Sequence, residues 1–350
     1  MIRMLQTLRL YLLQGIIFGE LTMKTMRLYL LFSTSLVLVF SNLFNIAAQA
    51  PNRAKIVFTS TRNSNAEIYV MNADGSQQIR LTHHPGDDFD PTWSPTGEHI
   101  AFVSERGQNG VFDIYLMDAN GKNIRPAFDE LDYRTAPTWS PDGKRIAYHT
   151  YSPIPDWAVY FNTTEGGTAE RVSKAGIYPG GFPDWSPDGT EIAFTGGSRT
   201  EWRIWIINLQ THEKEILLPK IKGGNMQDPA WSPDGKKLAF YWWKPDEQKS
   251  YIYIVNRDGN NLEKIVENAS RMVAWSPDGK ELLYRKTVGG QKLFFKINLD
   301  TGTETLLARF GQTIRHGQNI GWDWFDPKAL PVSPKPQLLT TVWGQMKIKD

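Results

Sequence analysis

The chain has 350 residues, carries a formal net charge of +2 and contains no cysteine. The missing cysteine excludes disulfides, thiolate metal sites, a cysteine nucleophile and a lipid-modified cysteine anchor. The near-neutral charge gives no reason to expect a nucleic-acid partner, which would show as a clustered basic excess. With 41% apolar and 12% aromatic residues, the chain can bury the core of one large all-β domain or of two ordinary domains.

The first 50 residues have the organisation of an export signal. A basic segment at 23–27 precedes an apolar stretch at 28–40, and Ala-Gln-Ala at 48–50 has the small side chains of a cleavage site. We therefore expect a signal peptide at 1–50, with 1–22 a start-site extension, and a periplasmic or secreted mature protein without stable membrane insertion. A retained anchor is the alternative, because the apolar stretch is nearly long enough to span a bilayer.

A Trp-Ser-Pro motif recurs through the rest of the chain. Its copies lie 46, 46, 46 and 44 residues apart, and a degenerate sixth copy follows after 49. The repeat tryptophans are Trp93, Trp139, Trp185, Trp231, Trp275 and Trp324. In most copies the motif continues as Asp-Gly, and Pro at the second and Gly at the fourth turn position fit a type I turn.

The predicted elements follow the same order in each unit. In the first unit, alternating apolar residues predict strands at 55–59 and 67–71, and an Asp-Gly turn then leads to a short strand at 79–82. The next unit begins with a strand that ends at Trp93. Four strands joined by turns form one antiparallel blade of a β-propeller.

The two ends of the repeat region are complementary. The mature chain begins with a second strand, whereas residues 320–325 supply only a first strand, so the two should pair and close the ring. The 277 residues of 51–327 divide into six units of about 46. We predict an all-β, six-bladed propeller of four-stranded antiparallel blades. A proline-rich tail at 328–350 would pack on its flank or bind a partner.

The order Trp-Ser-Pro-Asp-Gly, Ile-Ala-Phe, Ile-Tyr-Val-Met-Asn-Ala-Asp-Gly and Arg-Leu-Thr resembles the TolB-type β-propeller repeat, over residues 54–327. The resemblance implies the propeller fold and a periplasmic or secreted setting. TolB itself carries an α/β domain before its propeller, and an N-terminal segment there engages its inner-membrane partner. Here only residues 51–53 precede the first strand of the mature chain, so the resemblance covers the propeller alone.

Loops of variable length should gather on one face of such a ring. We call this the variable face: it holds the loops between second and third strands and those that lead to the next blade. The Trp-Ser-Pro and Asp-Gly turns form the opposite, turn face, where the repeat tryptophans serve as wedges between blades. Aromatic, Arg, Asp and His side chains of the variable face could grip an extended peptide or a glycan. The predicted binding residues are Asp90, Arg134, Trp157, Trp202, Asp228, Trp243, Arg271 and His316.

A metal or acid–base site is the sharpest alternative, with His83, Asp88, Asp90 and Asp228 as candidate ligands. However, the adjacent histidines of the pair 83–84 would point to opposite sides of an extended segment. The innermost strands contain four aspartates, at 90, 184, 228 and 323, but no His or Glu. Asp90 and Asp228 share one repeat position, where a weakly held Ca²⁺ or an ordered water could lie.

The motifs favour binding over catalysis. The chain contains no Gly-x-Ser-x-Gly elbow and no phosphate-binding glycine loop. We predict a monomeric, non-enzymatic scaffold that binds a protein or peptide through its variable face and needs no cofactor. The alternative is a carbohydrate-active or lactone-type hydrolase or lyase that uses the loop at 83–90.

Overall fold

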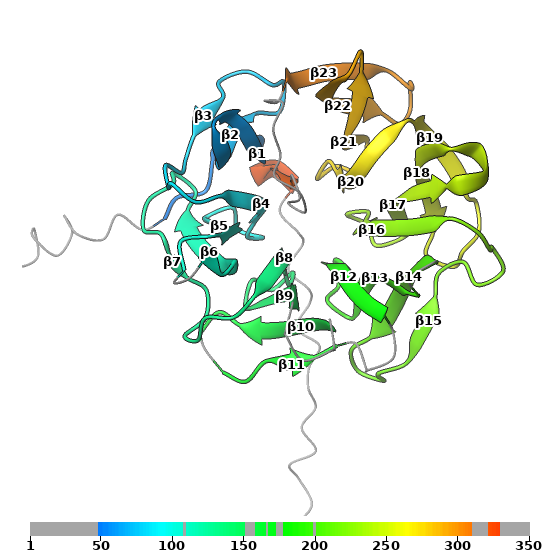
Figure 1. Ribbon diagram of the computed structural model, residues 1–350, viewed down its shortest axis with the longest axis horizontal. Helices are drawn as coiled ribbons and strands as arrows, with labels where there is room; N and C mark the ends of the chain where they lie inside the picture. The colour runs from blue at the N-terminus through cyan, green and yellow to red at the C-terminus, as the bar shows by residue number, and fades with distance from the viewer. Residues whose placement is uncertain are drawn as a thin grey trace, which may run out of the picture. The chain divides into compact units, whose positions relative to one another are not determined.

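The computed structural model describes residues 48–107, 110–150, 158–165, 167–172, 178–198, 201–309 and 321–329. These form six four-stranded sheets that stand as blades around a central tunnel, so the predicted six-bladed all-β propeller is confirmed (Figure 1). Throughout these ranges, no helix combines the length and the apolar character that a membrane span requires.

Each blade is named by its order in the ring, and its strands are given from the tunnel outward. Blade 1 contains β24 (Trp322–Phe325), β1 (Lys55–Asn63), β2 (Asn65–Asn72) and β3 (Ile79–Arg80). Blade 2 contains β4 (Asp88–Trp93), β5 (His99–Ser104), β6 (Asp113–Asp118) and β7 (Arg125–Pro126). Blade 3 contains β8 (Arg134–Trp139), β9 (Arg145–Thr150), β10 (Ala158–Thr163) and β11 (Glu170–Arg171).

The other three blades follow the same order. Blade 4 contains β12 (Tyr178–Trp185), β13 (Glu191–Gly197), β14 (Trp202–Asn208) and β15 (Lys214–Ile216). Blade 5 contains β16 (Asn225–Trp231), β17 (Lys237–Lys244), β18 (Lys249–Asn256) and β19 (Glu263–Glu267). Blade 6 contains β20 (Ala269–Trp275), β21 (Glu281–Val288), β22 (Gln291–Asn298) and β23 (Glu304–Arg309). Two short 3-10 helices are η2 (Pro245–Glu247) and η3 (Pro327–Ala329).

The ring closes as predicted, through antiparallel pairing of β1 with β24. Lys55 pairs with Phe325 and Phe58 with Trp322, and the Thr59 amide donates to the Gly321 carbonyl at 3.0 Å. Blade 1 therefore combines strands from the two ends of the repeat region, and β24 covers the tunnel-side edge of β1.

Local hydrogen bonds explain the residues of the Trp-Ser-Pro-Asp-Gly turns. In blade 3 the Ser140 hydroxyl donates to Asp142 at 2.5 Å and accepts from the Arg145 amide at 2.9 Å. Gly143 has φ of +69°, in the region where glycine carries no Cβ penalty. The same serine-to-aspartate bond recurs in blades 4, 5 and 6, so these aspartates act within their own turns.

Each described innermost strand from β4 to β20 carries a left-handed residue three positions before its tryptophan. These residues are Asp90, Ala136, Phe182, Asp228 and Met272, with φ between 52° and 75°. The register against the neighbouring strand shifts at or beside the same place, as β-bulges do. We call this repeat position the bulge position, and it lines the tunnel.

The core is divided among the interfaces between neighbouring blades. Trp93 of blade 2, for example, is 5% exposed and packs in one cluster with Val57 and Ile68 of blade 1. Each of the other repeat tryptophans likewise belongs to a cluster that reaches into the preceding blade. This packing fixes the angle between blades and therefore the positions of the innermost strands.

Candidate functional site: the central tunnel

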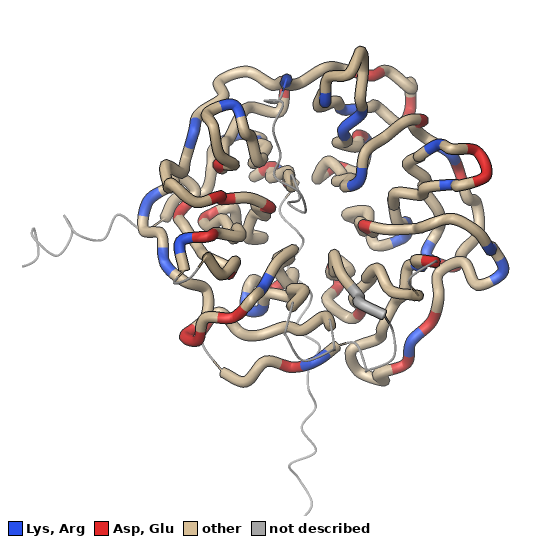
Figure 2. Tube along the Cα trace, viewed as in Figure 1, with Lys and Arg blue, Asp and Glu red and all other residues tan. Residues whose placement is uncertain are grey.

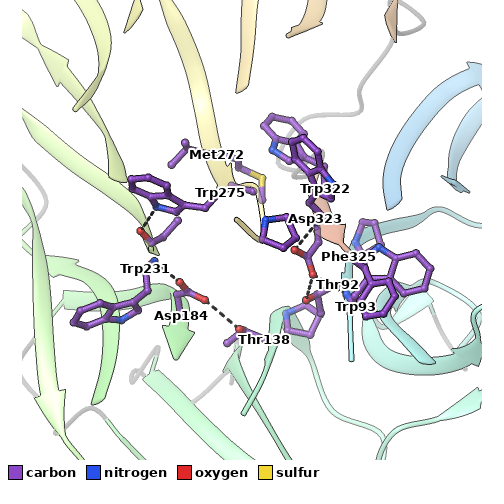
Figure 3. Close-up of a pocket in the computed structure, with 18 of the residues that line it drawn as sticks. Thr92, Trp93, Thr138, Asp184, Trp231, Met272, Trp275, Trp322, Asp323 and Phe325 are labelled. Carbon is purple, nitrogen blue, oxygen red and sulfur yellow. Dashed lines mark hydrogen bonds between the residues drawn. The ribbon is translucent and has the colours of Figure 1, made fainter. Parts of the chain in front are cut away.

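A cavity of about 400 Å³ occupies the tunnel, lined by the innermost strands and the Trp-Ser-Pro turns (Figure 3). The turn prolines from blades 2 to 6 contribute to one end of it. Four aspartates line the cavity in two levels, which follow from their repeat positions. Asp90 and Asp228 occupy the bulge position, and Asp184 and Asp323 lie immediately before a repeat tryptophan.

We call Asp184 and Asp323 the lower pair, and Asp90 and Asp228 the upper pair. Each aspartate of the lower pair joins two neighbouring blades. Asp323 of blade 1 accepts hydrogen bonds from the Trp93 amide at 2.8 Å and the Thr92 hydroxyl at 3.0 Å, both in blade 2. Asp184 of blade 4 accepts from the Trp231 amide of blade 5 at 2.7 Å. Blades 1 and 4 are three steps apart in a ring of six, so these two carboxyl groups belong to opposite sides of the tunnel (Figure 3).

Burial dominates the electrostatics of this lower pair. It raises the pKa of Asp184 to about 7, and the negative charge of Asp323 acts in the same direction. Burial also raises the pKa of Asp323. Because both groups hold backbone amides of the next blade, their first role in this geometry is to fix the blades around the tunnel.

The upper pair occupies blades 2 and 5, which are also opposite in the ring. The Asp90 and Asp228 amides each donate to a threonine hydroxyl of the preceding blade at 3.0 Å. Asp228 forms a two-pronged ion pair with Arg271 at 2.9 and 3.0 Å and also accepts from the Met272 amide at 3.1 Å.

The two upper carboxyl groups differ in their partners. Within the described part of the chain, the buried Oδ2 of Asp90 has no hydrogen-bond partner. Burial, followed by the negative charge of Asp228, raises the pKa of Asp90 to about 7. Asp90 therefore accepts a proton far more readily than an exposed aspartate, whereas Asp228 is held by a cation.

Two arginines of blade 6 lie near Asp228. The Arg271 guanidinium stacks on the Phe182 ring at 4.5 Å, and its side chain is 39% exposed. Arg285 on β21 is half-buried, and its Nε and Nη1 atoms have no hydrogen-bond partner among the described residues. Burial, followed by the positive charge of Arg271, lowers the pKa of Arg285 to about 10.

Comparison with known proteins places this geometry in a family. The model of the TolB beta propeller domain matches residues 32–153 and 178–319, which is more than half of the chain. The chain belongs to the TolB beta-propeller family. A comparison with curated proteins finds no match.

Solved structures share the TolB-like propeller fold at low identity. TolB from Acinetobacter baumannii has a TM-score of 0.67 and 18% identity, covering 77% of this chain and 66% of that one. This chain thus spans just under two thirds of that relative. A putative TolB from Agrobacterium tumefaciens has a TM-score of 0.59 and 19% identity, covering 73% and 88% of the two chains. An oligogalacturonate lyase from Vibrio parahaemolyticus has a TM-score of 0.52 and 14% identity, covering 73% and 74%.

The TolB-like propeller brings together three of the predicted binding residues. Asp228 forms the ion pair with Arg271, and after burial it is the charge of Asp228 that raises the pKa of Asp90. Trp157 and His316 lie outside the described residues.

Trp202 and Trp243 belong to neighbouring blades and are linked through Asn225. The Trp202 amide of blade 4 donates to the Asn225 side chain of blade 5 at 3.1 Å, and Asn225 pairs with Trp243 in the ladder. Both tryptophans are half-buried at strand ends next to variable-face loops. We call Trp202, Asn225 and Trp243 the tryptophan edge.

Arg134 lies inside the TolB-like propeller instead of on its surface. It is 8% exposed, donates to both carboxylate oxygens of Asp113 at 3.0 Å and to the Glu130 carbonyl at 2.8 Å. The guanidinium also lies against the rings of Phe128 and Tyr148, at 4.9 and 5.6 Å from their centroids. Its position makes it a link between blades 2 and 3, although its buried Nε has no hydrogen-bond partner among the described residues.

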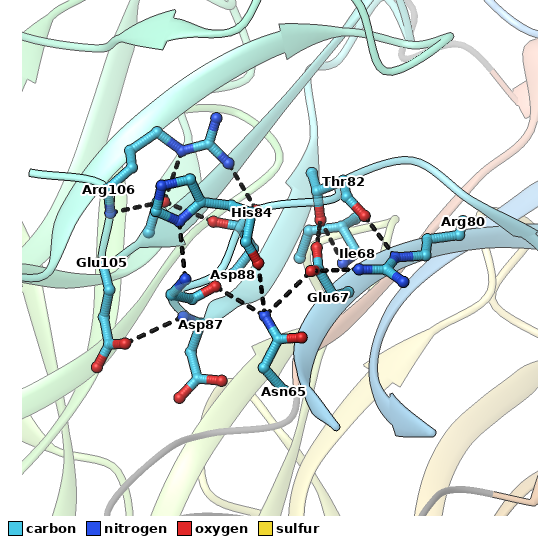
Figure 4. Close-up of polar contacts among 12 residues, drawn as sticks. Asn65, Glu67, Ile68, Arg80, Thr82, His84, Asp87, Asp88, Glu105 and Arg106 are labelled. Atoms are coloured by element: carbon cyan, nitrogen blue, oxygen red, sulfur yellow. Dashed lines mark hydrogen bonds and ion pairs between the residues drawn. The ribbon is translucent and has the colours of Figure 1, made fainter. Parts of the chain in front are cut away.

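In the loop at 83–90, the candidate metal ligand Asp88 and the neighbouring His84 are engaged in local contacts (Figure 4). His84 Nδ1 accepts from the Gly86 amide at 3.0 Å, and Asp88 accepts from Ser104 and from Arg106 at 2.6 Å. His83 is exposed. Across the described ranges, no three His, Asp or Glu side chains are grouped as metal ligands would be.

Sequence reasoning missed Arg285, which lies near Asp228 and Arg271. It stands ten residues after Trp275, at the repeat position that Val103, His149, Thr195 and Tyr241 occupy in blades 2 to 5. A charged residue at a position otherwise filled by apolar, hydroxyl or aromatic side chains was the available signal. Nothing in the blade pattern indicated whether an acid would lie beside it.

Proposed function

We propose that this TolB-like propeller is an exported, non-enzymatic binding protein that holds a protein or peptide segment on its variable face. The tryptophan edge carries the proposal, because it places two large half-buried aromatic side chains at one blade boundary. Aromatic side chains that are partly exposed contribute much of the binding energy in protein interfaces.

Three of the four tunnel carboxyl groups support binding over catalysis. Asp184 and Asp323 hold backbone amides of the next blade, and Asp228 holds Arg271. A general acid or base must reach the proton of a substrate, whereas these three groups are already bonded to the scaffold. Asp90 is the exception, because its Oδ2 has no hydrogen-bond partner among the described residues. The fold it shares with TolB structures supports an export setting, in agreement with the leader predicted from the sequence.

The test uses the mature protein, residues 51–350, and random peptides displayed on phage. Selected peptides are synthesised, and their affinities are measured by fluorescence anisotropy for wild type, for Trp202→Ala/Trp243→Ala and for Lys236→Ala. Lys236 is the matched control, because its side chain is 80% exposed in a Trp-Ser-Pro turn on the turn face. We expect the double variant to bind at least about 10-fold more weakly, as loss of two aromatic anchors predicts.

Two results would count against the proposal. Equal affinity of the double variant and wild type would place binding elsewhere, provided that both proteins keep the same Tm. Turnover of an oligogalacturonate or lactone by the wild type would instead support the hydrolase or lyase alternative. We include this test because an oligogalacturonate lyase shares the fold.

A further inference from the structure

The innermost strand of blade 6 departs from the ladder beside Arg285. In blades 2, 3 and 5, two residues of the innermost strand face one residue of its neighbour at the bulge. In blade 6 the register steps from Ala269 opposite Lys286 to Val273 opposite Tyr284, so residues 270–272 all face Arg285. This wider bulge separates the two strands at the one place where β21 carries a guanidinium.

The Arg285 guanidinium forms no ion pair within the described part of the protein, although the charge of Asp228 acts on it from nearby. Its Nε and Nη1 are buried without acceptors, although a buried charge is normally paired. The nearby carboxylate of Asp228 is already bound to Arg271 and to the Met272 amide. Leaving such donors unpaired destabilises the unliganded protein.

Other cations surround Arg285 and add to its potential. The positive charge of Arg271 lowers its pKa, and Arg285 in turn lowers the pKa of Lys292 on β22, although burial is the larger cause for both. Lys286 is balanced by Glu304 at 2.6 Å, but Lys292 has no ion pair among the described residues. Figure 2 shows Lys and Arg gathered along β20, β21 and β22.

We infer that Arg285, with Arg271 and Lys292 beside it, is a recognition site for a carboxylate group of the ligand. A planar guanidinium edge matches a carboxylate and can donate two parallel hydrogen bonds to it. The bound group would give the unpaired donors of Arg285 their acceptors. This inference deepens the proposed function by naming the chemical group that the partner presents. It rests on the proposed function in one respect, that the carboxylate belongs to an acidic peptide.

The site makes a prediction that a structural arginine would not share. If Arg285 binds a ligand, Arg285→Met removes an unpaired charge from the unliganded protein and raises its Tm, because residues that serve binding often lower the stability of the free protein. If Arg285 is structural, the same change lowers the Tm. The matched control is Arg125→Met, an exposed arginine on the outermost strand of blade 2.

The experiment measures Tm by differential scanning fluorimetry at pH 7 and constant ionic strength. The probes are acetate, inorganic phosphate, chloride, galacturonic acid and a capped peptide with one aspartate. We expect acetate and the aspartyl peptide to raise the Tm of wild type and of Arg125→Met by about 2 °C or more in a saturable way. Arg285→Met should start at a higher Tm and respond to none of the probes.

Each other outcome overturns a stated part of the inference. A lower Tm of Arg285→Met, or no saturable response of wild type to any carboxylate, removes the site. A response to phosphate but not to acetate changes the ligand class, and a response to galacturonic acid but not to the peptide moves the source from peptide to sugar. If peptide binding needs the tryptophan edge but not Arg285, the proposed function stands and the carboxylate site is removed. If carboxylates raise the Tm but no peptide binds, the carboxylate site stands and the proposed function is removed.

Discussion

Replacing Asp184 by asparagine tests whether a buried carboxyl group in the tunnel lowers stability at neutral pH. Its carboxyl accepts from the Trp231 amide at 2.7 Å and from the Thr138 hydroxyl at 3.4 Å. An asparagine of the same shape can accept from the amide and can donate to the hydroxyl, so both contacts survive. The substitution therefore removes the charge and little else.

The magnitude follows from the raised pKa of Asp184. Burial moves it from 3.8 to about 7 in the folded protein. At a pH between these values the folded state keeps a proton that the unfolded state has lost, so stability falls as pH rises through this window. At about 1.4 kcal/mol for each pKa unit, the group accounts for a loss of about 4 kcal/mol between pH 4 and pH 8.

The assay is urea unfolding of wild type, Asp184→Asn and Asp184→Ala at pH 4 to 8, followed by tryptophan fluorescence. We expect Asp184→Asn to gain stability relative to wild type as pH rises, by up to about 4 kcal/mol at pH 8. Asp184→Ala should be less stable than Asp184→Asn by about 1–3 kcal/mol at every pH, because the Trp231 amide loses its acceptor. Asp90 contributes the same pH slope to all three proteins and cancels in the comparison. A difference between wild type and Asp184→Asn that stays constant from pH 4 to 8 would refute the reasoning.

Two further predictions concern the packing of the ring. A Cβ on Gly97 would lie 2.2 Å from the Phe325 ring, whereas one on Gly143, with nearly the same φ, meets nothing closer than 3.8 Å. In thermal or urea unfolding, Gly143→Ala should therefore lower the free energy of unfolding by about 1–2 kcal/mol, for the backbone alone. Gly97→Ala should lower it by about 1–3 kcal/mol more, and equal losses would show that the Phe325 ring moves aside without cost. Arg134→Ala should lower the unfolding free energy by about 3–5 kcal/mol because it strands buried Asp113, and a variant within 1 kcal/mol of wild type would contradict the buried ion pair.

The propeller was predictable because its signals are local and repeated. Each Trp-Ser-Pro-Asp-Gly copy specifies a turn through bonds that span only five residues, and the spacing of the copies gives the number of blades. The pairing of β1 with β24 followed from counting strands at the two ends of the repeat. A resemblance to the TolB-type repeat gave the same fold.

The candidate site was predictable only in part. The bulge position places Asp90 and Asp228 in the tunnel because every unit repeats the same backbone. Arg134 could not be placed, because the residues between a fourth strand and the next blade can point outward or inward. Its burial depends on Asp113, which lies 21 positions away, and on rings from two blades.

By itself, the sequence determined the repeating unit, its turns and the number of blades, because those depend on hydrogen bonds and apolar periodicity within one unit. Only the tertiary structure decided which polar groups of different blades meet. The Trp93 amide finds its acceptor in Asp323, 230 positions away, and Arg285 finds none among the described residues. Contacts across the tunnel depend on the closed ring, and one repeat carries no information about its neighbour on the opposite side.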